Sequence, residues 1–228
     1  MAHQLSLELT RKLSSTPVGA ALLKTATEQV DLTEQLKPGI YQGTRRIGDH
    51  AHSFKVPFAA HRFLVMIPRD AESFKGKLTD LGNGQKGMVV GAYNKKIGEG
   101  RRLKYHRNHG NDMEAVLDLM KLKSQGAGPW GAKLKRVYRN SGDGPDDEIK
   151  TILEKARAFR AAEKTRPIKY PSALENIFAR GKNSNTFVAS LLAYSGFKDK
   201  SFRDMPGYDA GRKLRFKPEQ FGVKETEQ

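Results

Sequence analysis

Short apolar runs divide the central part of the chain into strands. FLVMI runs up to Pro68 and predicts a buried strand over residues 62–67. GMVVGAY predicts a second strand over 87–93, after the turn signal GNG, and RRLKYHR predicts a third over 101–107. We expect these strands to form an antiparallel meander whose first strand begins just after His61.

Other segments carry apolar residues at helical spacing. Residues 1–37 show mixed helical spacing up to the breaker Pro38-Gly39 and predict a helical N-terminal region. Residues 134–139 predict one more strand. Three further helices are predicted over residues 112–123, where Asp112 fits the N-cap position, 145–164 and 182–196.

These elements predict the α+β class, with a small antiparallel sheet packed against helices. The 228 residues are enough for one large domain and an appended segment. We expect residues 1–37 to form the helical N-terminal region and residues 38–228 the α+β domain. Within that domain, 108–169 is a candidate insertion.

Composition narrows the chemistry. The chain has no Cys, which excludes disulfides, a thiolate nucleophile and cysteine-ligated zinc. It has 41 Lys+Arg against 25 Asp+Glu, a formal net charge of +16. Such a charge attracts polyanions, namely nucleic acid, an anionic membrane surface or an anionic wall polymer, although it also serves solubility alone.

Neither a transmembrane segment nor a signal peptide is expected. The chain has no apolar run of about 18 residues. Its first residues lack a basic stretch followed by an apolar one. We therefore expect a protein made in the cytoplasm without a cleaved signal.

Two residues stand where chemistry is favoured. Ser184 lies at the start of the predicted helix 182–196, where free N–H groups and a partial positive charge favour an anionic nucleophile and an oxyanion. His61 directly precedes a strand, and histidine is the usual general base at neutral pH. Each also fits a structural role, Ser184 as a helix cap and His61 as a polar residue at a strand start.

Taken together, the two motifs resemble those of a known family. His61-Arg62-Phe63-Leu64-Val65 and Asn183-Ser184-Asn185-Thr186-Phe187 are similar to the two key motifs of circularly permuted papain-like (NlpC-type) hydrolases. That superfamily includes the lecithin retinol acyltransferase group and bacterial toxin-like domains. In it a histidine opens a strand, and the nucleophile follows late, at a helix start, in a motif like Asn-Cys-x-x-Phe. The resemblance covers residues 54–107 and 170–210, including the tail segment Pro206-Gly207-Tyr208, and implies a permuted papain-like fold.

The chain departs from the family at the nucleophile, because Ser184 stands where the family has cysteine. A hydroxyl is far harder to deprotonate than a thiol and needs a well-placed base and oxyanion donors. Three interpretations are open: a working serine nucleophile, a non-catalytic relative that keeps the cleft for binding, and a replacement that inactivates a cysteine enzyme.

Further site residues are expected from their positions at the ends of the predicted strands. A third polar residue should orient His61, and His106 is the first choice, with Asn94 next. We expect the substrate-binding side chains to be Asn183, Asn185, Asn94 and His52. We expect no metal and no cofactor, because His50-x-His52 and His106-x-x-His109 have no nearby carboxylate in a recognised ligand pattern.

The resemblance implies an antibacterial effector with hydrolase activity. Its substrate would be an amide bond, as in peptidoglycan peptides, or a lipid acyl bond, cleaved by Ser184 with His61 as base. A secretion-spike protein would deliver it to a target-cell periplasm, and an immunity protein would cover its cleft. The alternative is a non-catalytic basic protein that binds nucleic acid or serves in an assembly. Nucleic acid is the less favoured partner, because no recognised binding motif is present.

Overall fold

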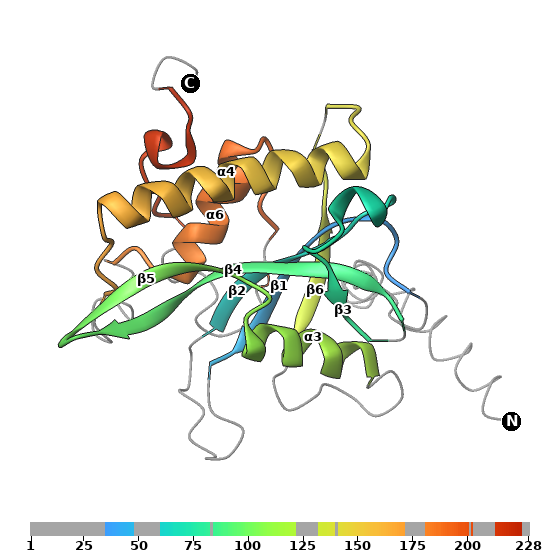
Figure 1. The fold of residues 1–228 in the computed structure, drawn as a ribbon, viewed down its shortest axis with the longest axis horizontal. Helices are drawn as coiled ribbons and strands as arrows, with labels where there is room; N and C mark the ends of the chain where they lie inside the picture. Colours follow the sequence, from blue (N-terminus) through green and yellow to red (C-terminus); the bar gives the residue numbers. More distant parts are fainter. Residues whose placement is uncertain are drawn as a thin grey trace, which may run out of the picture.

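The computed structural model describes residues 35–47, 60–82, 84–121, 132–139, 141–171, 181–200, 202 and 213–224. These residues form a small antiparallel sheet with helices on both of its faces (Figure 1), which confirms the α+β class. The strands are β1 (Gly39–Arg46), β2 (Ala60–Ile67), β3 (Thr79–Asp80), β4 (Lys86–Ile97), β5 (Gly100–Arg107) and β6 (Lys133–Val137). The helices are α3 (Gly110–Lys121), α4 (Pro145–Thr165) and α6 (Ser184–Tyr194), with short 3-10 turns η1 (Glu72–Phe74) and η2 (Pro218–Phe221).

The strand order is β3-β4-β2-β1-β6, and β5 pairs with β4 beyond this path. All of these pairings are antiparallel. β4 and β5 form a long hairpin whose turn lies between Ile97 and Gly100 and includes Gly98 with φ of 59°, a conformation that favours glycine. The meander predicted from three apolar runs is therefore present as β2, β4 and β5.

The first strand of the meander, β2, begins at Ala60 and includes His61, one or two residues earlier than predicted. The sheet also has a strand that the sequence did not predict: β1 precedes the meander and pairs with the whole of β2. The sequence of β1 did not indicate a buried strand, because the polar residues Gln42 and Thr44 interrupt its apolar pattern although both are fully buried. Gly43 has a packing role: a Cβ at this position would lie 2.3 Å from the ring of Phe63, so only glycine lets that ring cross β1.

The segment 108–169, a candidate insertion, contributes α3, β6 and α4 to this fold. β6 pairs with β1, with Ile40 opposite Val137. α4 lies along one face of the sheet and buries Ile152 and Phe159 in the core. Its 21 residues begin with Pro145 and three acidic residues, which suit the positive end of a helix dipole.

The predicted helical region 1–37 lies almost wholly outside the described residues. At its end, Leu36 is buried and held by the Gln85 side chain, which accepts from the Leu36 N–H at 2.8 Å and donates to its carbonyl at 2.6 Å. The tail segment 206–208 also lies outside the described residues. Among the described helices, none combines the length and the apolar character needed to cross a bilayer.

Two hydrophobic clusters fill the two faces of the sheet. Leu64 of β2 packs with α4 and α6, whereas Phe63 packs with Val116 of α3. Successive strand residues point to opposite faces. The polar start of β2 follows the same alternation, so His61 lies on the α3 face and Arg62 on the α6 face.

Candidate active site

The start of β2 is open on the side of β4. β4 pairs with β2 only over residues 64–66, whereas β1 pairs with all of it. The Asn185 side chain occupies the position of a missing strand: its Oδ1 accepts from Arg62 N–H at 3.0 Å, and its Nδ2 donates to the Ala60 carbonyl at 3.1 Å. One amide thereby satisfies two buried main-chain groups and fixes the start of α6 against β2.

A capping box defines the first turn of α6. Asn183 Oδ1 accepts from the N–H groups of Asn185 and Thr186, at 2.9 and 3.1 Å, and Thr186 Oγ1 accepts from Asn183 N–H at 3.1 Å. Ser184 is the first helical residue, as the sequence predicted. Its own N–H is not among those that Asn183 accepts.

These two anchors bring Ser184 next to His61. Ser184 Oγ lies 3.0 Å from His61 Nδ1, although 123 positions separate the two residues along the chain. Both are buried, with exposed fractions of 3% and 6%. The contact predicted between the two sequence motifs is therefore present in the fold.

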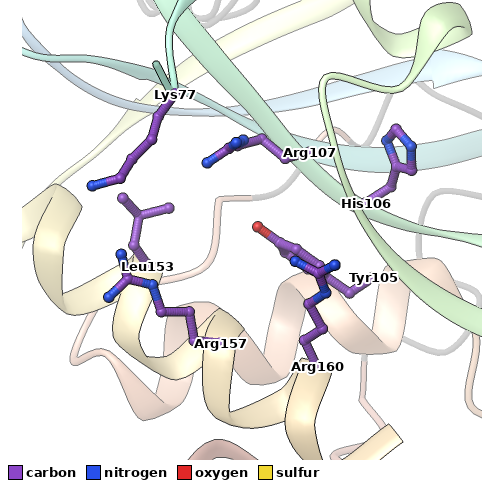
Figure 2. Close-up of a pocket in the computed structure, with 7 residues that line it drawn as sticks. All are labelled: Lys77, Tyr105, His106, Arg107, Leu153, Arg157 and Arg160. Carbon is purple, nitrogen blue, oxygen red and sulfur yellow. The ribbon is translucent and has the colours of Figure 1, made fainter. Parts of the chain in front are cut away.

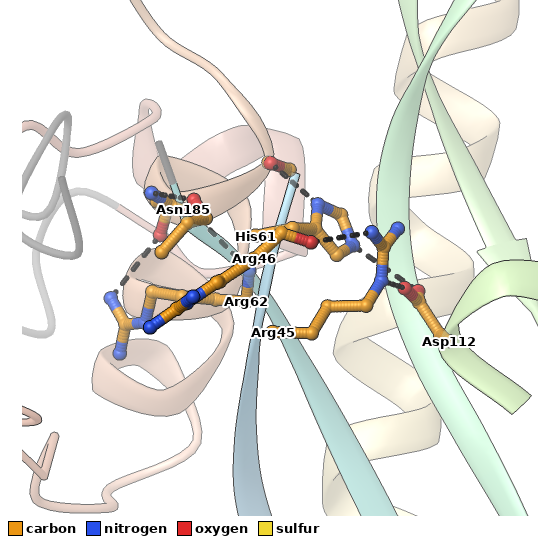
Figure 3. Close-up of polar contacts among 8 residues, drawn as sticks. Arg45, Arg46, His61, Arg62, Asp112 and Asn185 are labelled. Carbon is orange, nitrogen blue, oxygen red and sulfur yellow. Dashed lines mark hydrogen bonds and ion pairs between the residues drawn. The ribbon is translucent and has the colours of Figure 1, made fainter. Parts of the chain in front are cut away.

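The other side of the His61 ring faces a carboxylate (Figure 3). Asp112 Oδ2 lies 3.1 Å from His61 Nε2, and Arg45 Nε donates to the second oxygen of Asp112 at 2.7 Å. Asp112 belongs to the first turn of α3, which begins at Gly110, so it is not the N-cap that the sequence predicted. The turn before α3 is held at Asn108, which has φ of 56° and accepts from a β4 amide.

The neighbours of Asp112 favour its ionised form. Burial alone would raise the pKa of Asp112, but the charges and hydrogen bonds of His61 and Arg45 outweigh burial and hold its pKa well below the usual range. An ionised Asp112 only accepts hydrogen bonds, so it selects the tautomer with hydrogen on His61 Nε2. Nδ1 then presents its lone pair to the hydroxyl of Ser184.

Gly91 of β4 leaves room for this pair. A Cβ at Gly91 would lie 3.3 Å from Asp112 Oδ2 and 3.7 Å from His61 Nε2. A side chain at this position would therefore press on the hydrogen bond between the two groups.

Tyr170 adds a second hydroxyl at Ser184. The main chain at Tyr170 lies alongside β5, and its N–H donates to the Arg101 carbonyl at 2.9 Å. Burial raises the pKa of Tyr170, and a hydrogen bond with Ser184 opposes that rise in part. Tyr170 therefore stays protonated at neutral pH, with its hydroxyl in contact with the Ser184 side chain.

His106, the expected orienting residue, has other neighbours. Its ring packs against Tyr93 and His109, with centroid distances of 5.3 and 5.2 Å. Its Nδ1 is buried and has no hydrogen-bond partner among the described residues. Burial lowers the pKa values of both histidines, and the nearby Asp112 carboxylate opposes this. The residue that contacts His61 Nε2 is Asp112.

The structure does not gather the four residues expected to bind substrate at one place. Asn183 and Asn185 have the structural contacts described above, in the helix cap and at the edge of β2. Asn94 lies on β4 opposite Leu103, and its Oδ1 is buried with no partner in the described part of the chain. His52 lies outside the described residues.

A second buried polar network lies on the α6 face of β2. Arg62 is fully buried and makes an ion pair with Asp199. Its Nη1 donates to the Asn185 carbonyl at 3.4 Å. Nearby, the Gln42 side chain bonds both the N–H and the carbonyl of Lys200, each at 2.9 Å. This network ties the segment after α6 to β1 and β2.

Sequence reasoning missed Asp112 and Arg45 as members of the site. In the sequence, the position of Asp112 is explained equally well by a helix cap. Arg45 lay in a strand that was not predicted. The sequence did contain an indication of this role. Asp112 stands at the start of a helix that directly follows a strand, and such a position lies at the end of the sheet.

No cluster of three or more His, Cys, Asp or Glu side chains suited to a metal occurs among the residues that the structure describes.

Comparison with protein-family models, with curated proteins and with solved structures returned no match. The site is therefore interpreted from its own geometry.

Proposed function

We propose that the protein is a hydrolase of amide or ester bonds in which Ser184 is the nucleophile, His61 the general base and Asp112 the residue that orients His61. The observation that carries the proposal is the continuous chain of contacts from Ser184 Oγ through both nitrogens of His61 to Asp112, at 3.0 and 3.1 Å. A nucleophile, a base and an acid that holds the base are the parts that a weak nucleophile such as serine requires.

The first half of the reaction acylates the enzyme. The Ser184 oxygen attacks the acyl carbon while its proton moves to His61 Nδ1, and the carbonyl oxygen becomes an oxyanion. The bond to the leaving amine or alcohol then breaks, and the leaving group takes the proton from Nδ1. Asp112 stabilises the imidazolium that exists between these two transfers.

The second half releases the acyl group. Water donates a proton to His61 Nδ1 and attacks the acyl carbon, and collapse of this second intermediate returns the proton to the Ser184 oxygen. Asp112 remains ionised throughout, because Arg45 accompanies it on its other oxygen.

The Ser184 N–H lies at the positive end of α6, and it is the donor that we assign to the oxyanion. A preorganised donor of this kind is worth about 10²–10³ in kcat. It supports a serine that works as a nucleophile rather than one that only caps a helix.

The substrate and setting follow from the resemblance of the two motifs. We assign the fold to the permuted papain-like type, the bond to peptidoglycan peptides or a lipid acyl group, and the role to an antibacterial effector acting in a target-cell periplasm. The net charge of +16 suits an anionic wall polymer. An immunity protein and a secretion-spike protein are the partners that this role requires.

Expression in the periplasm of a bacterial host tests the proposal. Lysis by the natural chain and its loss in His61→Ala and Ser184→Ala would support a serine hydrolase. Lysis by Ser184→Cys alone would mark a disabled cysteine enzyme. Absence of lysis from all four chains would favour the non-catalytic alternative.

A chemical experiment tests the nucleophile without knowledge of the substrate. Purified protein is treated with a fluorophosphonate probe, and the labelled peptide is identified by mass spectrometry. We expect labelling at Ser184, lost in His61→Ala. The matched control is Ser190→Ala, in the same helix, whose Oγ accepts from Phe216 N–H at 3.0 Å; it should label normally.

A further inference from the structure

A basic cavity lies between β5 and α4, outside the residues that form the candidate active site (Figure 2). Its volume is about 290 Å³, just below the roughly 300–1,000 Å³ that is typical of ligand sites. The lining residues are Lys77, Tyr105, His106, Arg107, Leu153, Arg157 and Arg160.

The sequence spacing explains why these side chains converge. Leu153, Arg157 and Arg160 are four and three positions apart and so share one face of α4. Tyr105 and Arg107 are two positions apart on β5 and point to the same side of the sheet. Lys77, after η1, closes the cavity from a third segment. In Figure 2, the ring of His106 points away from this space.

The charge in the cavity is of one sign. Four of its seven lining side chains are cations and none is an acid. Within the described part of the chain, none of these four cations forms an ion pair. Other basic side chains nearby are paired, such as Lys104 with Glu163 and Lys150 with Asp147. Like charges held together destabilise a fold, so an unneutralised cluster in a concave site favours binding of an anion.

Tyr105 adds a neutral donor to the cationic wall. Burial raises the pKa of its hydroxyl, and the charges of Arg107, Arg160 and Arg157 oppose that rise in part. The hydroxyl therefore remains protonated at neutral pH. In Figure 2 it points into the same space as the three guanidinium groups.

We propose that this cavity binds a small polyanion that carries two or more adjacent phosphate groups. Guanidinium groups match phosphate oxygens with paired hydrogen bonds. One phosphate monoester carries a charge of about −1.5 to −2 at neutral pH, so a single group leaves much of the four positive charges uncompensated. The apolar side chain of Leu153 and the small volume favour a compact ligand over a polymer. This binding is independent of the proposed hydrolase activity.

Isothermal titration calorimetry on the full chain at about 0.15 M salt tests the site. The probes are tripolyphosphate and a nucleoside triphosphate, with orthophosphate for comparison. We expect one saturable site for at least one triphosphate probe and weaker binding of orthophosphate. Equal affinity for both triphosphates would identify the phosphate chain alone as the ligand, and preference for the nucleotide would identify a nucleotide source.

Arg157→Gln/Arg160→Gln should weaken triphosphate binding by about tenfold or more, because each arginine supplies charge-assisted hydrogen bonds. The matched control, Lys96→Gln/Lys164→Gln, removes the same charge from exposed positions outside the cavity. Circular dichroism of both variants checks that each is folded. No saturable binding, equal losses in the two variants, or tighter binding of a single-stranded oligonucleotide that both variants weaken equally would each overturn the proposal in favour of a diffuse basic surface.

Discussion

His61 and Arg62 are neighbours on β2, yet they belong to two different buried polar networks on opposite faces of the sheet. The network of His61 runs from a hydroxyl through a titratable ring to a carboxylate. The network of Arg62 joins a permanent cation to Asp199 and to the Asn185 carbonyl. Both are buried, and both connect β2 to a segment more than 120 positions later.

The two networks differ in whether they can transfer a proton. Arginine stays protonated in proteins, so the Arg62 network can hold parts of the chain together but cannot move a proton. Histidine can gain and lose a proton near neutral pH. Burial alone therefore does not separate a catalytic group from a structural one; the presence of a proton path ending at a nucleophile does.

The largest expected effect is on turnover. His61→Ala and Ser184→Ala should each lower kcat by about 10⁶, and the double variant should lose no more than either, because the two residues act as a unit. Steady-state rates on the cleaved substrate, measured with Ser190→Ala as control, check this. Multiplicative losses in the double variant would show that the two groups act separately.

Asp112→Asn should lower kcat by about 10⁴, because an amide in place of the carboxylate no longer selects the productive tautomer of His61. The same rate assay measures it, alongside His106→Asn. The histidine variant should keep near-normal turnover, since His106 packs against Tyr93 and His109. The reverse ranking would return the orienting role to His106.

Arg62→Met should act on stability instead. It removes the charged partner of Asp199 from a buried ion pair, so we expect a loss of about 3 kcal/mol in the free energy of unfolding. Urea denaturation measures this loss. Folded Arg62→Met protein should keep its turnover, and a loss of turnover without a loss of stability would place Arg62 in the chemistry.

The smallest effect concerns acid stability. The folded pKa of Asp112 is lower than its unfolded value of about 3.9, so this group stabilises the fold above that pH and loses its contribution as pH falls through the folded pKa. The stability difference between the natural chain and Asp112→Asn should therefore shrink below about pH 4. Urea denaturation from pH 7 to pH 3 tests it, and a difference that stays constant with pH would contradict the assigned charge.

Most of the elements could be predicted from the sequence because their apolar residues repeat with a clear period. β2, β4 and β5 and the three helices were predicted within a few residues of their observed bounds. β1 escaped because it lies in the interior of the sheet and buries Gln42 and Thr44, whose amide and hydroxyl groups look like surface positions. Local pattern cannot reveal a strand whose polar groups are buried by distant segments.

The site was predictable only in part, for a related reason. His61 and Ser184 each stand at the start of an element, where position alone indicates a role. Asp112 also stands near a helix start, but its contact with His61 depends on how α3 packs across the sheet. The packing of α3 depends on the turn at Asn108 and on the space left by the missing side chain of Gly91. Both are features of the assembled fold.

The bridge formed by Asn185 has a consequence for timing. His61 and Ser184 come from segments 123 positions apart, and they meet only when the first turn of α6 docks on the open edge of β2. A growing polypeptide that has emerged only as far as α4 holds His61 and Asp112 but lacks Ser184. Under the proposed mechanism, reactivity therefore begins late in synthesis, once α6 has emerged and docked.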